Sequence, residues 1–254
     1  MNSCVQDAVS FIRHSSSFLW LTKHAFSKIN LGWKLALVYK GYSSPSLLDT
    51  YGEERLPVIA EMLGKTTELF NQAKVSGGEI KRGSELRQLA VNYRGSSIVY
   101  EDDVKVATEK GIGYNTSSET DARPGDRAPG APGLKVVNEK EEKNIIIHDV
   151  FSADRHTVLL FSKVKNMDFK PVLDVLQGLP AGTVRTVLIL SQGTGLPMAG
   201  VFDKVLVDED GYAYTGYHIG EETSIIVVRP DGIVGARARS EAGLKKYFQN
   251  IFQA

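Results

Sequence analysis

Hydrophobic positions between about Asn30 and Asn71 recur at helical spacing. Leu31, Leu35 and Val38 occupy positions i, i+4 and i+7, which is typical of one face of an α-helix. Gly41 follows at the place where a glycine commonly ends a helix. The pattern therefore predicts a first helix that ends near residue 40.

A second helical pattern follows. Ser46 and Asp49 have the spacing of a capping box, which predicts a helix start at Ser46. Pro57 suits the first turn of a further helical stretch, because a proline there removes no helical hydrogen bond. One apolar face is predicted at 3.6-residue periodicity, formed by Val58, Ile59, Met62, Leu63, Thr66, Leu69 and Phe70.

The composition changes after Tyr114. From there to Leu134 the chain is rich in Asn, Thr, Ser, Gly, Pro and charged residues, and Ala122–Gly130 is incompatible with a regular element. We interpret this stretch as a linker with a domain boundary near residue 120. The sequence thus predicts two domains, residues 1–119 and residues 120–254.

The second half has the alternation of an α/β domain. The order β-α-β-(α)-β-β-α is that of a thioredoxin-like fold, and a turn at Arg229–Gly232 joins the last two strands. The predicted elements are strand Thr157–Ser162, helix Asp168–Gln177, strand Val184–Leu190, a weaker helix Tyr212–Tyr217, strands Ser224–Val228 and Ile233–Ala236, and helix Glu241–Phe252.

Thiol chemistry is excluded for this second domain. The only cysteine is Cys4, and no cysteine lies between Thr157 and Asp168, where a thioredoxin redox motif would stand. No proline precedes the Ser224 strand at the place of a thioredoxin cis-proline. We expect a packing or dimerisation module instead. The apolar face of the last helix (Tyr247, Phe248, Ile251 and Phe252) is either the surface for such a homo-oligomer or ordinary intrachain core.

Charge and hydropathy narrow the possible partners. Among 254 residues, 30 Lys and Arg balance 30 Asp and Glu, which favours neither nucleic acid nor an anionic membrane as a partner. No apolar run approaches the ~20 residues that span a bilayer. We expect a cytoplasmic protein.

Five segments resemble a known family when taken in order. They are M-N-S-C-V-Q-D-A at residues 1–8, N-L-G-W-K-L-A-L at 30–37, L-L-D-T-Y-G-E-E-R-L-P at 47–57, G-D-R-A-P at 125–129 and V-R-P-D-G at 228–232. Their order across nearly the whole chain resembles the C-terminal portion of class A FAD-dependent aromatic hydroxylases, in the branch of phenol 2-monooxygenase (phenol hydroxylase-like).

The resemblance implies a function and a cofactor. Members hydroxylate phenolic rings with FAD, NAD(P)H and O2, and their thioredoxin-like C-terminal domain is implicated in subunit contacts. The resemblance places the main chain of Met1 and Asn2 at the flavin, where a helix N-terminus would accept the negative charge that develops on the ring. The alternative is that both residues merely begin a tail.

The chemistry of such an enzyme is otherwise missing. No G-x-G-x-x-G fingerprint occurs, and the family's substrate-pocket residues would lie upstream of Met1. We therefore expect a fragment that is inactive alone, with no catalytic residue of its own. The alternative is a non-catalytic thioredoxin-like interaction module.

Residues 9–28 interrupt the family pattern. The family passes from Q-D-A almost directly into N-L-x-W-K, whereas here Val9–Lys28 intervenes without helical periodicity. We interpret this segment as a translated intron, with a lineage-specific insertion as the alternative. In either case we expect it to uncouple Met1 and Asn2 from the Trp33 helix.

Metal and phosphate sites are not indicated. The histidines His14, His24, His148, His156 and His218 show no metal-ligand spacing. Ser191–Gly195 follows a strand as a phosphate loop would, but no Lys-Ser/Thr pair comes after it, so a plain loop is predicted.

Overall fold

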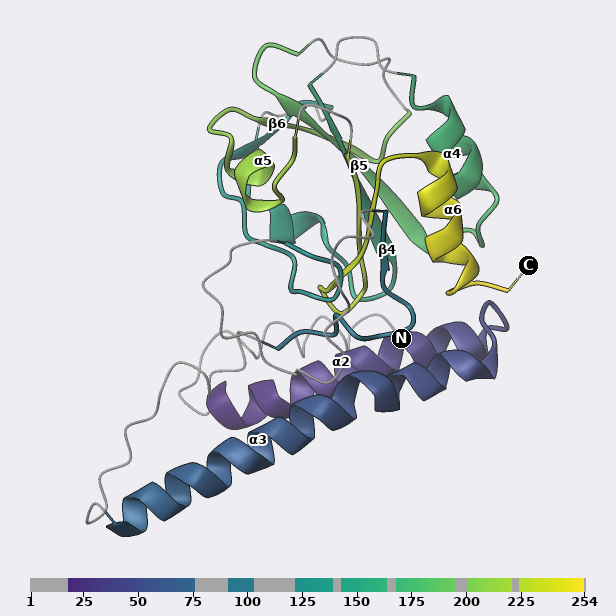
Figure 1. Cartoon of the computed structure of the whole chain (residues 1–254). Helices are drawn as coiled ribbons and strands as arrows, with labels where there is room; N and C mark the ends of the chain where they lie inside the picture. Colours follow the sequence, from purple (N-terminus) through teal and green to yellow (C-terminus); the bar gives the residue numbers. More distant parts are fainter. Residues whose placement is uncertain are drawn as a thin grey trace.

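The computed structural model describes seven segments of the chain, residues 18–75, 91–102, 122–138, 143–163, 168–194, 201–220 and 224–253. They contain a pair of helices near the N-terminus and an α/β unit that holds the rest (Figure 1). The predictions for Met1, Asn2, Cys4 and residues 103–121 fall outside the described residues.

A mixed sheet forms the centre of the α/β unit. Its order is β1-β8-β7-β4-β5-β6-β2-β3, with β4, β5 and β6 parallel to one another and β7 antiparallel to β4. The strands are β1 (Tyr100–Glu101), β2 (Leu134–Val136), β3 (Lys143–Ile145), β4 (His156–Ser162), β5 (Val184–Ser191), β6 (Lys204–Asp208), β7 (Ser224–Val228) and β8 (Val234–Ala238).

Both faces of the sheet are covered. On one face, Val158 and Leu160 of β4 pack with helices α4 (Lys170–Gln177) and α6 (Glu241–Gln249). On the other face, Leu159 and Phe161 of β4 pack with the short helix α5 (Tyr212–Gly216). A strand buried on both faces reads as a continuous apolar run, and this is why β4 was predictable.

Most predicted elements of this unit are confirmed, and so is the α/β class. Four strands were missed: β1, β2 and β3, which precede β4, and β6, which lies between β5 and α5. The open question about the last helix is also resolved. Its apolar residues Tyr247, Phe248, Ile251 and Phe252 are buried in the intrachain core, so they offer no surface to a second subunit.

The N-terminal helices are α2 (Phe18–Tyr39) and α3 (Asp49–Val75), joined through the 3-10 turn η1 (Pro45–Leu48). Gly41 has a φ of +70° and ends α2 as predicted: its N–H donates to Val38, and the Tyr42 N–H donates to Leu37. This is the Schellman arrangement, in which a left-handed residue lets the last carbonyls find donors.

Three predictions about these helices are wrong. The capping residue is Ser44, whose side chain accepts from the Ser46 N–H, so the Ser46–Asp49 capping box does not form. Pro57 lies inside one continuous helix of 27 residues and starts no new one. Helix α2 begins at Phe18, so part of the Val9–Lys28 segment is helical and runs without a break into the Trp33 helix.

No helix within the described segments is long and apolar enough to cross a membrane. The domain boundary near residue 120 stays a prediction.

Candidate functional site

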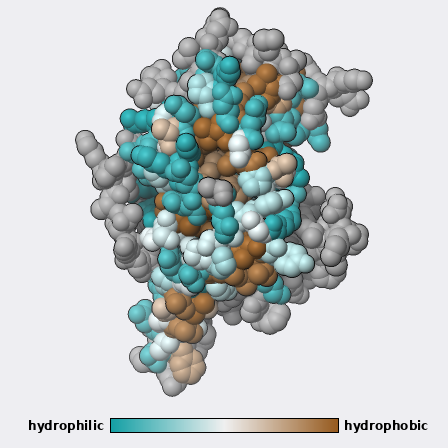
Figure 2. Space-filling view, turned by 90° about the vertical axis from the view of Figure 1, so that its right-hand side faces the viewer, coloured by the Kyte–Doolittle hydropathy of each residue, from teal (hydrophilic) through white to brown (hydrophobic). Residues whose placement is uncertain are grey.

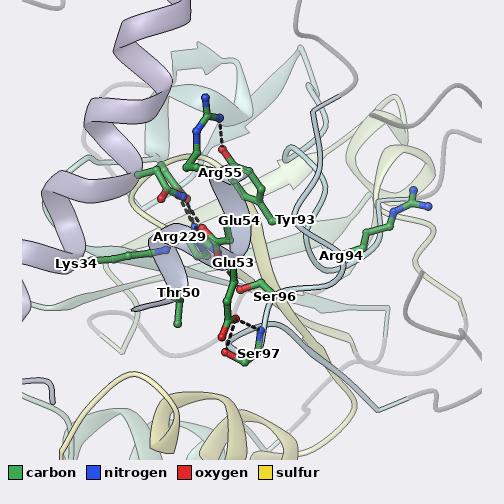
Figure 3. A network of polar contacts seen from close by, with 12 residues as sticks. Lys34, Thr50, Glu53, Glu54, Arg55, Tyr93, Arg94, Ser96, Ser97 and Arg229 are labelled. Atoms are coloured by element: carbon green, nitrogen blue, oxygen red, sulfur yellow. Dashed lines mark hydrogen bonds and ion pairs between the residues drawn. The ribbon is translucent and has the colours of Figure 1, made fainter. Parts of the chain in front are cut away.

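Three of the family-like motifs, far apart in sequence, meet in one buried cluster. N-L-G-W-K of α2 contributes Asn30 and Lys34, the E-R pair of α3 contributes Glu54, and the R-P-D-G turn between β7 and β8 contributes Arg229 and Asp231. Figure 3 shows Lys34 and Arg229 pointing toward Glu54 from different elements. We call these five residues the polar joint, because they connect the helix pair to the sheet.

Arg229 and Glu54 form the centre of the polar joint. Arg229 donates from Nη1 to Glu54 Oε1 at 2.7 Å and from Nη2 to Oε2 at 3.0 Å, with both side chains fully buried. The guanidinium also pairs with Asp231, its neighbour in the turn. A bidentate ion pair of this kind fixes the relative orientation of the two side chains and also strengthens their interaction.

Lys34 and Asn30 complete the polar joint. Lys34 Nζ lies 2.8 Å from Glu54 Oε2, and Asn30 Nδ2 donates to Glu54 at 2.6 Å and to Asp231 at 2.9 Å. Two cations thus face two carboxylates, and the cluster carries no net formal charge. Of its polar atoms, Asn30 Oδ1 is buried with no hydrogen-bond partner within the described part of the chain.

Burial and pairing shift the pKa values of these groups. Burial opposes ionisation of Glu54, but the charge and hydrogen bonds of Arg229, with Lys34, lower the Glu54 pKa to about 2. Burial lowers the Lys34 pKa to about 8 despite the attraction of Glu54. For Arg229, burial works against the charge, yet Asp231 and Glu54 raise its pKa well above the ordinary value. All three groups are therefore charged at neutral pH.

The aromatic rings of Trp33 and Tyr93 flank the Arg229 guanidinium. The Arg229 Cζ atom lies 5.2 Å from the Trp33 ring centre and 5.7 Å from that of Tyr93. Trp33 also donates from Nε1 to Asp231 at 3.3 Å. The rings exclude water and add a cation–π attraction to the ion pairs.

Residues 91–98 close the polar joint from a third side. Ser96 Oγ donates to Glu54 at 2.7 Å, and Arg55 donates to the Tyr93 hydroxyl at 3.0 Å (Figure 3). The next carboxylate along α3, Glu53, is exposed and accepts from the N–H and Oγ of Ser97. The two adjacent glutamates therefore hold the same loop, one from inside the protein and one from its surface.

The fourth motif, G-D-R-A-P, lies beside this loop. Arg94 forms a two-point pair with Asp126, at 2.8 Å for each contact. Gly125 has a φ of +96°, and a Cβ there would stand 2.4 Å from the Arg94 backbone nitrogen. Only glycine permits this crossing of two backbones.

His156 lies next to the polar joint at the start of β4. Its ring is fully buried and has edge contacts with Trp33, Tyr247, Phe248 and Phe252 at centroid distances of 5.3 to 6.1 Å. Burial, with the charge of Arg229, lowers its pKa to about 3, so the ring is neutral at pH 7. Its Nε2 has no partner among the described residues.

Two further histidines lie within the described residues. His148 and His218 are exposed. Across the described segments, no group of three or more His, Cys, Asp or Glu side chains is placed to hold a metal ion. Ser191–Thr194 is a turn in which the two hydroxyls are 2.9 Å apart, in line with the plain loop predicted.

Sequence reasoning missed the polar joint, although its members were inside the motifs. The apolar face predicted from Leu31, Leu35 and Val38 is wrong, because Leu31 and Leu35 are exposed. Helix α2 instead buries the face that carries Trp33, Lys34 and Leu37. A charged residue on a buried face needs a partner of opposite charge. The sequence alone does not identify that partner.

Comparison with known proteins finds relatives of one type. Residues 27–66, which contain most of α2 and two thirds of α3, match the FAD binding domain family. The chain is 30% identical to the FAD-dependent monooxygenase ankC of Aspergillus thermomutatus, over 89% of this chain and 43% of that protein. It is 27% identical to pentachlorophenol 4-monooxygenase of Sphingobium chlorophenolicum, over 84% and 38%.

Solved structures show the same likeness. Aklavinone-11 hydroxylase, determined with FAD and aklavinone, superimposes with a TM-score of 0.58 at 25% identity, over 89% of this chain and 39% of that one. The flavin-dependent monooxygenase PieE, determined with FAD and substrate, gives a TM-score of 0.59 at 21% identity, over 89% and 42%. The chain thus spans less than half the length of the relatives it matches.

The chain is thus similar to FAD-dependent monooxygenases, and these matches support FAD as the cofactor. The described residues alone do not form an FAD site. Met1 and Asn2 lie outside them, and the buried polar groups of the matched segment bind one another. The closely packed Gly125 and Gly235 face protein atoms, so neither leaves a cradle for a phosphate.

Proposed function

We propose that this chain is the C-terminal part of an FAD-dependent monooxygenase that hydroxylates a phenolic ring, in the branch of phenol 2-monooxygenase. The observation that carries the proposal is the convergence of N-L-x-W-K, E-R and R-P-D-G in one buried cluster. Motifs that resembled the family only in order along the sequence also come together in space.

In this proposal the polar joint has an architectural role. It fixes the helix pair, whose residues 27–66 match the FAD binding domain family, to a C-terminal unit that we infer to be thioredoxin-like. The succession β4-α4-β5, then β7-β8-α6, supports that inference. We further propose that the unit mediates homo-oligomer contacts through a surface other than the buried face of α6.

The redox chemistry would come from FAD, which activates O2 for transfer to the ring after reduction by NAD(P)H. Contact of the flavin with the main chain of Met1 and Asn2 stays a prediction. So do the cytoplasmic location and the inactivity of the chain by itself. No described side chain is assigned a catalytic role.

An FAD titration of the purified chain tests this proposal. We expect no stoichiometric quenching of flavin fluorescence while circular dichroism shows a folded protein. A fusion of the chain to the part of the ankC relative that lies outside their match should bind FAD and oxidise NAD(P)H faster when a phenol is added.

Two results would contradict the proposal. Tight FAD binding by the chain alone would mean that a complete flavin site exists within it. A fusion that binds FAD but never responds to a phenolic compound would instead favour a non-catalytic interaction module.

A further inference from the structure

Arg55 is a buried arginine that forms no ion pair within the described segments. It is 5% exposed, although the next residue of α3, Leu56, is 67% exposed. Figure 2 shows hydrophobic side chains along the helical projection that extends below the rest of the molecule, so a charged side chain is buried on a helix that exposes apolar ones. Among the described residues, its hydrogen bonding is limited to the Tyr93 hydroxyl.

Other arginines of the chain show what the Arg55 side chain is suited to hold. A guanidinium presents Nε and Nη2 along one edge, and this pair of donors matches the two oxygens of a carboxylate. Arg94, Arg155 and Arg229 each use this edge for an aspartate, with Nε–O distances of 2.8, 3.1 and 3.0 Å. In Arg55 the Nε atom is buried and has no hydrogen-bond partner among the described residues.

The polar joint does not compensate the charge of Arg55. Its carboxylates, Glu54 and Asp231, are both held by Arg229. Figure 3 shows the Arg55 side chain pointing away from Glu54 and toward Tyr93. A guanidinium keeps its charge inside a protein, and its burial is unfavourable unless an opposite charge and hydrogen bonds offset the loss of water.

The Tyr93 hydroxyl supplies a second kind of donor at the same place. Its oxygen accepts from Arg55 Nη1 at 3.0 Å, so its own hydrogen can still be donated. Burial raises the pKa of Tyr93, which keeps the hydroxyl protonated at neutral pH. Val58, Val91 and Ile233 pack in one cluster with Tyr93. In such apolar surroundings an ionic attraction is stronger than in water.

We propose that the Nε–Nη2 edge of Arg55 and the hydroxyl of Tyr93 form a binding site for the carboxylate of a small organic acid. The two carboxylate oxygens would accept from three donors, and the negative charge would compensate the guanidinium. The positive charge of Arg127 also acts at Tyr93, which favours an anion there. The inference does not depend on the proposed function, because neither Arg55 nor Tyr93 has a part in hydroxylation.

The test uses the full chain, with sodium acetate as the probe. Urea unfolding midpoints are measured against acetate concentration, since a ligand of the folded state raises the midpoint in a saturable way. Sodium chloride at equal ionic strength is the salt control. The Nε–H signals of isotope-labelled arginine, followed by NMR, report directly on the contact.

Three variants separate the groups of the site. Arg55→Lys keeps the charge but removes the planar edge, and Tyr93→Phe removes only the hydroxyl. Arg155→Lys is the matched control, because it makes the same change at an arginine whose edge holds Asp154 at the surface.

We expect the parent chain and Arg155→Lys to bind acetate with equal affinity. Arg55→Lys should bind at least about tenfold more weakly, because it cannot form the bidentate contact. Tyr93→Phe should also bind more weakly, by a smaller factor. Acetate should shift one arginine Nε–H signal of the parent chain, and it should be the signal that Arg55→Lys removes.

A further variant tests the cost of the buried charge without any ligand. Arg55→Met keeps the apolar stem and removes the cation, so in buffer without acetate its urea midpoint should equal or exceed that of the parent chain. A lower midpoint would show that the charge of Arg55 is already compensated within the chain, and would overturn the inference.

Three results of the acetate titration would also overturn it. They are an acetate response no larger than the chloride response, equal acetate affinity in the parent chain and Arg55→Lys, and saturation by phosphate at lower concentration than by acetate. Loss of acetate binding in the fusion with the remaining part of the ankC relative would instead assign Arg55 to an acidic side chain of that part.

Discussion

The two faces of the helix pair differ in a way that reverses the usual distribution of polar and apolar residues. The inward face carries Lys34 and Glu54, both fully buried and bound to Arg229. The outward face carries Leu35 and Leu63, which are 51% and 59% exposed. At these four positions the charged side chains are buried and the leucines are exposed.

This reversal shows that the two faces have different tasks. Removing ions from water costs more free energy than most buried pairs recover, so a buried cluster is weak evidence for stability by itself. What the polar joint provides is geometry, because the bidentate fork of Arg229 permits one arrangement of three elements. The apolar face can gain free energy only when a second surface covers it.

The largest loss of stability should come from removing a charged side chain of the polar joint on the inward face. Glu54→Ala leaves Lys34 and Arg229 buried without their shared carboxylate, and we expect it to lower the free energy of unfolding by roughly 3–5 kcal/mol. Urea denaturation followed by circular dichroism measures this loss. The adjacent Glu53→Ala is the matched control, since Glu53 is exposed, and should cost at most about 1 kcal/mol. Equal losses for both variants would refute the distinction between the two carboxylates.

A smaller loss of stability should appear when the pH is lowered, and its source is His156, which lies next to the polar joint. The His156 pKa is about 3 in the folded chain and near 6.5 in the unfolded chain. Below pH 6.5 the unfolded chain therefore binds a proton that the folded chain does not, and the free energy of unfolding falls as the pH is lowered. We expect a loss of about 2 kcal/mol between pH 6.5 and 5. Glu54 adds to this loss only below about pH 4.5, because its pKa falls from 4.5 to about 2 on folding.

His156→Leu should flatten the stability profile between pH 6.5 and 5, and His148→Leu, at an exposed position, should not. Urea unfolding midpoints measured between pH 6.5 and 5 for the parent chain and both variants test this difference. An unchanged slope in His156→Leu would show that another group controls the acid response.

Two glycines of the helix pair should respond with opposite signs. Gly41 has a φ of +70°, so Gly41→Ala should destabilise the chain by about 1 kcal/mol. Gly64 lies in the interior of α3 with no atom within 4 Å of an added Cβ, so Gly64→Ala should stabilise it by roughly 0.5–1 kcal/mol. Thermal unfolding of both variants checks the signs, and a shared sign would contradict the account.

The smallest effect on the chain alone should come from the outward face. Leu63→Gln removes an exposed side chain that is unnecessary for the intrachain core, so the free energy of unfolding should change by less than about 0.5 kcal/mol. A loss above 1 kcal/mol in urea denaturation would mean that Leu63 already packs within this chain.

The elements that could be predicted from the sequence are those that depend on local patterns. The continuous apolar runs of β4 and β5 and the R-P-D-G turn could be located because periodicity and turn chemistry are short-range signals. Strand β6 was missed because K-V-L-V-D is short and has polar ends. One of those ends, Asp208, accepts hydrogen bonds from the N–H groups of Ala213 and Tyr214 at the start of α5.

The polar joint was beyond local reasoning. Glu54 and Arg229 are 175 positions apart, and the sequence around either residue does not indicate that the other is its partner. Periodicity also marked Ile59 and Leu63 as one face of α3, but it could not show that this face is exposed while Val58 is buried. Which apolar stripe enters the core depends on the packing of distant elements.

The most direct test of the account is hydrogen–deuterium exchange of the parent chain and of the Glu54→Ala variant. We predict faster exchange in residues 28–39 and 53–70 of the variant, because the polar joint holds both helices on the sheet unit, with no change in β5. Equal exchange of both helices in the two proteins would contradict the architectural role of the polar joint.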